Sequence, residues 1–278
     1  MNVPLVAETI GHIGSFPVTN TLVNSTVLMV LFVGCAWYLK SRITKVPGKL
    51  QNAIESMIEF LLGYFDQVTN DRKKSVQFFP IVGTLFLFIL LSNWLGLLPG
   101  AGSIGIWQTH EGALELVPIM RSANSDLNMT IAMAAFSVIV SHLFGMFTLG
   151  FFTHWNKFIQ LGTVWQAVKT LKPITILTAF VEFLVGFIEL FSEAAKIVSL
   201  SLRLFGNVFA GEVLLTVISS LVSYFVPLPF MGLELLVGVV QATVFSLLVL
   251  VYLTISTTAP HGDEEHDEAK GHEHAPAH

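Results

Sequence analysis

The sequence predicts an all-α polytopic membrane protein with about five transmembrane helices and one amphipathic helix on the inner membrane surface. Of its 278 residues, 53% are hydrophobic and only 12% are charged, whereas an ordinary soluble domain is about 25% charged. Its mean hydropathy is +0.72. Several apolar runs reach the ~20 residues that a helix needs to cross a bilayer. The predicted spans are residues 21–39, 76–98, 127–152, 174–226 and 230–256.

Residues 1–258 are expected to form a single membrane domain, followed by a disordered, acidic, His-rich tail at 259–278. The stretch Pro260–His278 holds six acids and one lysine, which accounts for the whole net charge of −5. The rest of the chain is neutral and has no basic patch, so a nucleic-acid role is excluded. Five of the nine histidines lie in the tail. A metal-binding tail is the alternative to a solvated one, and no spacing elsewhere predicts a cofactor or a metal.

The first span, about Thr21 to Leu39, is followed at once by basic residues, which are Lys40, Arg42, Lys45 and Lys49. Cytoplasmic ends of membrane helices are enriched in Lys and Arg. With the five spans above, 11 of the 14 basic residues fall on that side. The N-terminus is therefore expected outside and the C-terminus in the cytoplasm.

Residues 50–68 have apolar positions at spacings of three and four, which predicts an amphipathic helix. Its polar side carries Glu55, Glu59 and Asp66. Such a helix can lie on the inner membrane surface or against a partner helix.

The second and third spans are connected by a loop, residues 100–126, whose one basic residue is Arg121. Pro80 is expected to interrupt the second span. Asn93 and Asp126 lie near the outer ends of their spans, where they could line an inlet or be ordinary membrane-edge residues. His142, inside the third span, could line a channel or make a hydrogen bond between helices.

The fourth span is too long to stand upright. Residues 174–226 would extend about 80 Å as one helix, against a ~30 Å bilayer core. The helix must be steeply tilted or broken, and Gly206 is the expected break. The fifth span, 230–256, can also tilt, and it carries Glu234 and Gln241 seven residues apart on one face.

Residues 180–212 are apolar apart from a stripe of charges. Glu182, Glu189, Lys196 and Arg203 are spaced seven apart, which places them along one side of a helix, and Glu193 fits the same stripe. Charges in hydrocarbon must face partners or a water-filled path. Glu189, Glu193 and Lys196 could simply pair with one another. No acid lies one turn from Arg203, so its counter-charge is expected on another helix or another chain.

Glu212 and Glu234 are single carboxyl groups in apolar runs. Such a group can carry a proton near neutral pH, so either could be a proton relay or a protonated acid that bonds another helix. Gln241 could bond Arg203 or join two helices.

Five motifs occur in the order that characterises subunit a of F-type ATP synthases, and the chain resembles this family from about residue 15 to 256. The most specific is SLSLRLFGNVFAGE (Ser199 to Glu212). The others are VPGKLQNAIE from Val46, NWLGLLPG from Asn93, SDLNMT from Ser125 and GVVQATVFSLLVLVYL from Gly238.

The resemblance implies a non-catalytic stator subunit that couples proton flow to rotation of a proteolipid ring and so to ATP synthesis. It implies an essential arginine at Arg203 and two proton half-channels. Residues of the proton path would be Ser199, Asn207, Glu212, Glu234 and Gln241. Other half-channel linings would be Glu182, Glu189, Glu193, Lys196, Asn93, Asp126 and His142. Partners would be the ring subunit c, the peripheral-stalk subunit b and the rest of the complex, in a bacterial plasma membrane.

Two rival functions remain at this point. An independent secondary transporter would show internal repeats about the midplane, and none is found between the halves of the sequence. A purely structural membrane scaffold would leave Arg203 unexplained.

Overall fold

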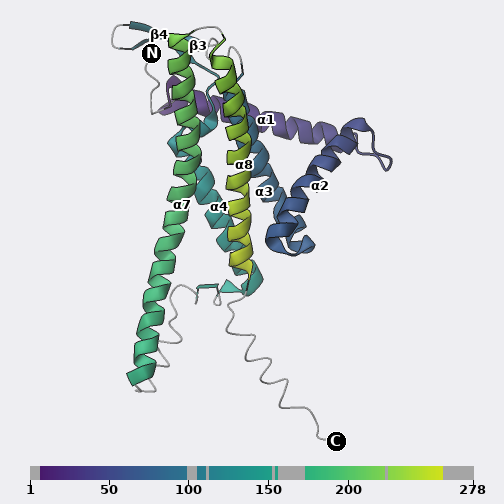
Figure 1. The fold of residues 1–278 in the computed structure, drawn as a ribbon, viewed down its shortest axis with the longest axis vertical. Helices are drawn as coiled ribbons and strands as arrows, with labels where there is room; N and C mark the ends of the chain where they lie inside the picture. Colours follow the sequence, from purple (N-terminus) through teal and green to yellow (C-terminus); the bar gives the residue numbers. More distant parts are fainter. Residues whose placement is uncertain are drawn as a thin grey trace, which may run out of the picture. The chain divides into compact units, whose positions relative to one another are not determined.

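Helices dominate the computed structural model, which describes residues 7–98, 105–110, 113–151, 154–155, 173–222 and 225–258 (Figure 1). The helices are α1 (Asn20–Lys40), α2 (Lys49–Thr69), α3 (Arg72–Gly96), α4 (Leu127–Leu149), α7 (Pro173–Leu221) and α8 (Pro227–Thr257). Within the described residues, five helices are long and apolar enough to cross a membrane, namely α1, α3, α4, α8 and the Leu184–Leu221 part of α7. The all-α polytopic fold with five spans is therefore confirmed. The tail, 259–278, lies outside the described residues.

The long fourth span is one unbroken helix. α7 runs for 49 residues and passes through Gly206, the expected break, without interruption. At ~1.5 Å per residue it measures about 73 Å, so it cannot stand upright in a ~30 Å hydrocarbon core. Of the two alternatives drawn from the sequence, the continuous helix is the one that forms.

Pro80 does not interrupt the second span either, because α3 continues through it. Proline removes one backbone donor and so frees the carbonyl four residues before it, that of Val76, a loss that membrane helices tolerate. α4 ends earlier than expected, at Leu149, because Gly150 takes a left-handed conformation with φ of 88°.

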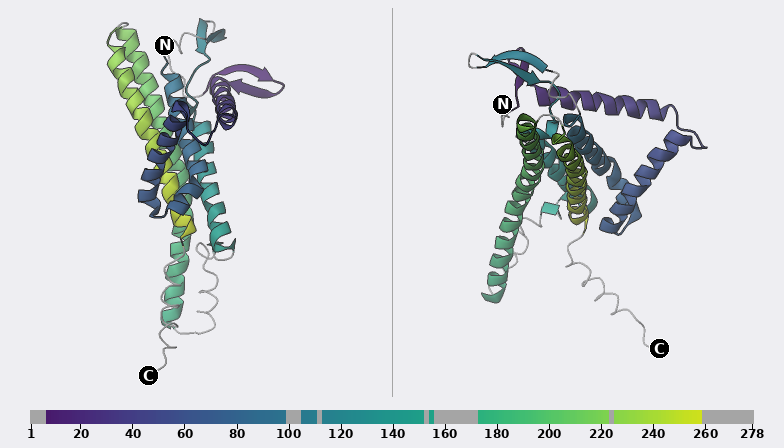
Figure 2. Two further views of the ribbon diagram at one scale, coloured as in Figure 1. Left: turned by 90° about the vertical axis from the view of Figure 1, so that its right-hand side faces the viewer. Right: turned by 45° about the horizontal axis from the view of Figure 1, so that its top comes forward.

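The chain divides into two compact units, Met1–Ser137 with Ala195–Val251, and Val138–Ala194 with Tyr252–His278. In the first unit, α7 and α8 lie side by side, while α1 lies across the direction of α8 (Figures 1 and 2). Helices that cross in this way cannot both stand upright. α1 has 21 residues, or about 31 Å, which matches a bilayer core, whereas α8 has 31 residues and must tilt.

The core of the first unit contains large apolar side chains alternating with small residues. Small residues let membrane helices approach closely, which replaces the hydrophobic driving force that is absent in lipid. Fully buried members are Phe78, Val82, Ile89, Ala134, Leu200, Leu204, Ala242, Phe245 and Val249.

Two antiparallel hairpins, which the sequence analysis did not anticipate, accompany the helices. They are β1 (Thr9–Ile13) with β2 (Phe16–Thr19), and β3 (Gly105–His110) with β4 (Ala113–Pro118). A two-stranded hairpin alone is marginally stable. Asn20, at the start of α1, donates its side-chain amide to the carbonyl of Pro118 and its backbone N–H to Glu8. Both hairpins are thus fastened to α1.

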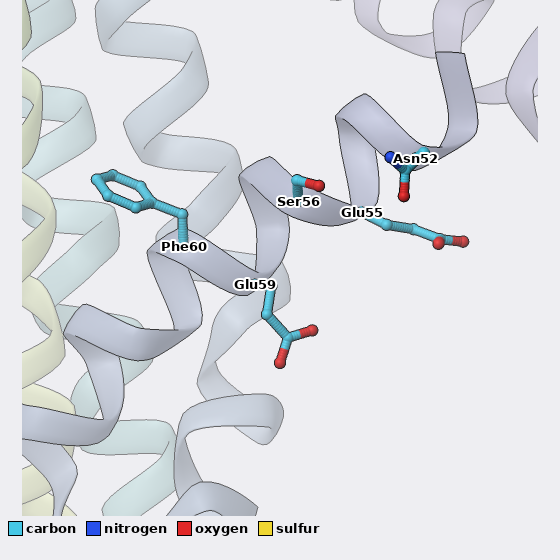
Figure 3. A pocket seen from close by; sticks show the side chains of 5 residues that line it. All are labelled: Asn52, Glu55, Ser56, Glu59 and Phe60. Carbon is cyan, nitrogen blue, oxygen red and sulfur yellow. The ribbon is translucent and has the colours of Figure 1, made fainter. Parts of the chain in front are cut away.

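The amphipathic character of α2 is confirmed. Leu61, Leu62 and Phe65 are buried, and α2 packs on α3, while Glu55 and Glu59 are exposed. The two carboxylates point to the same side of α2, beside a shallow hollow that Asn52, Ser56 and Phe60 also line (Figure 3). Arg72, at the start of α3, pairs with Asp66 at 2.7 Å and Glu59 at 3.1 Å, which fixes the turn between the helices.

A substitution at Gly96 can test how tightly the end of α3 packs. A Cβ atom there would lie 2.9 Å from Cβ of Ser122 and 3.1 Å from its backbone nitrogen. We expect Gly96→Val to lower the free energy of unfolding by about 1–3 kcal/mol through overpacking. Thermal unfolding in detergent, followed by tryptophan fluorescence, measures the change. Gly34→Ala on α1 is the control, because nothing lies within 4 Å of that Cβ. Equal stability of the two variants would contradict the packing described here.

Candidate functional site

Arg203 lies on α7 with its side chain exposed. Among the residues that the structure describes, its guanidinium makes one hydrogen bond, a long one of 3.5 Å from Nη2 to the hydroxyl of Ser199 one turn earlier. Among the described residues, no carboxylate forms an ion pair with it. The side chain is therefore a permanent cation that the described part of its own chain does not neutralise.

Of the two alternatives drawn from the sequence for Gln241, the structure shows a bond that joins two helices and none to Arg203. The Oε1 atom of Gln241 accepts a hydrogen bond of 2.7 Å from Nδ2 of Asn207, one turn beyond Arg203 on the same helix. Gln241 is buried, with 4% of its surface exposed. The reason is reach, because at this level α7 and α8 are close enough for the short Asn207 side chain to bridge them. Asn207 and Gln241 thus fix the two helices beside the arginine.

Glu212, one turn and a half further along α7 from Asn207, is held by a cation from its own chain. The Nε atom of Arg121 lies 2.9 Å from Oε1 of Glu212 and 3.1 Å from its Oε2. Arg121 is buried, with 3% exposed, and the Glu212 side chain is 30% exposed. Sequence reasoning treated Arg121 only as a loop residue. The feature of the sequence that could have pointed to Arg121 is that it is the single basic residue of that loop.

Glu234 reaches α7 at the residue next to Glu212. A Cβ atom built on Gly211 would overlap the carboxyl group of Glu234, so a larger residue at 211 would displace this group from its present position. Glu234 is half-buried, and it makes no ion pair with any described residue. The structure therefore brings the two acids to adjacent positions on α7 but gives a fixed counter-ion to only one.

Asn93 and Asp126 belong to a polar network at the ends of α1, α3 and α4. The amide of Asn124 donates to Oδ1 of Asn93 at 2.7 Å, and the hydroxyl of Thr21 donates to Asp126 at 3.1 Å. Asn93 also lies against α8, since its Cβ is 3.3 Å from a Cβ built on Gly238. These contacts place the predicted inlet residues in the same unit as Glu212.

The second unit holds a separate polar group. Nε2 of His142 on α4 lies 3.4 Å from Oε2 of Glu193 on α7, and its Nδ1 lies 3.2 Å from Nε2 of His154. Glu189, one turn from Glu193, is half-buried, and so is Lys196 of the first unit. The side chain of Glu182 lies outside the described residues. His154 was not among the residues singled out from the sequence.

No three His, Cys, Asp or Glu side chains of the described ranges come together as a metal site. The five histidines of the tail fall in the part of the chain that the structure does not describe. The chemistry available at the two polar groups is that of charge pairing and proton transfer.

Comparison with known proteins gives one consistent result. A profile of the family described as "ATP synthase A chain" matches residues 22–254. "ATP synthase subunit a" of Moorella thermoacetica is 29% identical over 87% of this chain and 92% of its own length. The protein of the same name from Mycobacterium tuberculosis is 31% identical over 89% of each chain. "ATP synthase subunit a, sodium ion specific" of Propionigenium modestum is 28% identical over 95% of this chain and 82% of its own.

The ion pair between Arg121 and Glu212 can be tested by a double-mutant cycle. We expect Arg121→Met to lower the free energy of unfolding by about 1–3 kcal/mol, because it leaves a carboxylate in apolar surroundings without its counter-ion. The value lies below the ~3–5 kcal/mol of a fully buried pair because Glu212 is partly exposed. Adding Glu212→Gln should recover much of the loss in detergent unfolding experiments.

Arg72→Met is the matched control for that cycle, since Arg72 forms ion pairs at an exposed site, with 47% of its side chain accessible. Exposed pairs contribute little to stability, because solvent screens them. An Arg121 variant no less stable than the Arg72 variant would show that the pair does not matter.

Proposed function

The chain belongs to the ATP synthase A chain family, and from this premise we propose that it is the stator subunit that carries protons past a rotating proteolipid ring. Membership places it in the membrane sector of an F-type ATP synthase, a complex that makes ATP from ion flow. The catalytic sites lie elsewhere in the complex, so this subunit acts by translocating ions. Its proposed partners are the ring subunit c and the peripheral-stalk subunit b.

The observation that carries the proposal is the position of Arg203. It is a cation on an exposed face of a membrane helix, and its only hydrogen bond among the described residues goes to a neutral hydroxyl. The desolvation cost of such a group requires an opposite charge or water. In the proposed mechanism a ring carboxylate supplies that charge once it has lost its proton. The guanidinium also repels a bare proton, which prevents a direct leak between the two sides.

Two half-paths then force each proton to travel with the ring. The outer path would run past Asn93 and Asp126 to the two acids at the α7–α8 contact. The inner path would use the acids of the earlier part of α7, which are Glu182, Glu189 and Glu193. Each charge that crosses 100 mV releases about 2.3 kcal/mol, so several crossings must be summed for each ATP.

Between the two outer acids, we assign the exchangeable proton to Glu234. Glu212 is held by the guanidinium of Arg121 at 2.9 Å, so proton exchange there would disturb this contact. Glu234 lies one residue away against Gly211 with no ion pair among the described residues. It can therefore bind and release a proton without breaking a structural contact.

The proposed membrane is the plasma membrane of a bacterium, with the N-terminus outside and the C-terminus in the cytoplasm. The basic residues after α1 support this orientation, because Lys40, Arg42, Lys45 and Lys49 all follow that span. The transported ion is proposed to be the proton, and a sodium dependence of ATP synthesis would show otherwise.

Replacing Arg203 tests the central role. We expect Arg203→Ala to abolish proton-driven ATP synthesis in inverted membrane vesicles, because no fixed cation would remain to draw the deprotonated ring site past the stator. Immunoblots of the purified complex check that the variant assembles. Val198→Ala is the control, since Val198 lies five residues earlier on another face of α7 and is 56% exposed. Normal synthesis by an assembled Arg203→Ala complex would reject the proposal.

The assignment of the relay acid is tested by Glu234→Gln and Glu212→Gln, each measured across a range of pH on the outer side. We expect Glu234→Gln to lower synthesis by at least ~10-fold and to remove the acid-side limb of the pH profile. Glu212→Gln should keep the profile while reducing the amount of stable complex. Glu55→Gln on the exposed side of α2 is the control. If only Glu212→Gln removed the acid-side limb of the pH profile, Glu212 would be the relay acid and Glu234 the structural one.

A further inference from the structure

We propose that Glu193, His142 and His154 form a proton relay that serves the inner half of the path, an inference that rests on the proposed function. The three side chains come from α7, from α4 and from the segment after α4. Each belongs to the second compact unit. They form a continuous row of groups that can each accept and release a proton.

The geometry of the row is that of two successive proton transfers. The carboxylate Oε2 of Glu193 lies 3.4 Å from Nε2 of His142. The other nitrogen of the same ring, Nδ1, lies 3.2 Å from Nε2 of His154. Both nitrogens of His142 are thus in contact with a proton-exchanging partner, one on each side. The first distance is long for a hydrogen bond at rest and needs a small approach before transfer.

Imidazole is suited to this position because it can bind a proton on one nitrogen while it releases another from the opposite one. In the outward-to-inward direction, the carboxylic acid of Glu193 gives its proton to Nε2 of His142. The Nδ1–H of His142 then passes to Nε2 of His154, and His154 gives up its Nδ1 proton to water. That nitrogen is buried, so a water molecule must enter beside it for this last step. Each step breaks one N–H or O–H bond and forms one N–H or O–H bond, so charge and atoms balance.

His154 is closely packed. It is buried, with 3% exposed, and it packs on Gly145, where a Cβ atom would lie 2.6 Å from its Cε1. A larger residue at 145 would displace the ring. Among the described side chains of this unit, the remaining titratable groups are Glu189 on α7 and Tyr252 on α8, and no described Lys or Arg belongs to it.

The position of Glu193 along α7 also fits a role in the proposed inner path. Glu193 precedes Arg203 by ten residues, or about 15 Å of helix, toward the end that follows the basic inner segment. A proton that has left the ring beyond Arg203 therefore meets Glu193 before it reaches the inner surface. The plain alternative is that His142 only joins helices. A structural role predicts lower stability without any change in how conduction depends on inner pH.

The test measures passive proton conduction through the membrane sector in vesicles from which the catalytic part has been stripped. His142→Gln keeps a hydrogen-bonding side chain but cannot carry a proton. We expect it to reduce conduction at least ~10-fold and to flatten the dependence on inner pH, because glutamine cannot bind and release a proton. His154→Gln and Glu193→Gln should do the same, and Thr148→Ala, an exposed change on α4, should not.

Two outcomes in all three variants would overturn the relay. One is conduction within twofold of the parent protein, and the other is reduced conduction whose dependence on inner pH is unchanged. If His142→Gln does not assemble, the variants of His154 and Glu193 decide by the same criterion. Arg203→Ala is measured for ATP synthesis in parallel. Normal synthesis there would reject the proposed function itself, whereas lost synthesis with normal conduction in the three variants would reject only the relay.

Discussion

A charge inside a membrane must be neutralised by a neighbouring charge or kept beside water, and this chain meets the demand in two ways. Arg121 is buried and neutralised internally, because both oxygens of Glu212 lie within about 3 Å of its Nε. Arg203 is exposed and, within the described residues, has only the hydroxyl of Ser199. The first arginine closes a structural contact between the segment before α4 and α7. The second leaves its positive charge available to another molecule, as the proposed stator role requires.

Close approach of α7 and α8 makes the rest of the site possible. The carboxyl group of Glu234 occupies the space over Gly211, and Asn207 reaches Gln241 directly. Lipid offers no hydrophobic force between helices, so small residues and interhelical hydrogen bonds provide the attraction. The same small residues thus hold the helices together and bring titratable groups of one helix to the surface of the other. Stability and ion translocation depend on a common packing arrangement.

The elements of the fold could be read from the sequence because hydropathy and amphipathic period are local properties. Averaged over a span, they gave five membrane helices and the helix at 50–68, with boundaries within a few residues. A local rule also led to an error, because Pro80 does not interrupt its helix. Of the two alternatives left open for the long span, the continuous helix forms, without a break at Gly206. The two hairpins were missed, since their stability comes from contacts with α1.

By itself, the sequence determined which residues are chemically exceptional, because any charge in an apolar run is costly wherever the run folds. That reasoning identified Arg203, Glu212, Glu234 and the stripe along α7. Only the tertiary structure decided how they are partnered. The Arg121–Glu212 pair joins positions 91 residues apart, and Gln241 bonds Asn207 rather than Arg203. His154 reaches His142 through packing on Gly145. Such pairings depend on distances across helix interfaces, and no local pattern encodes them.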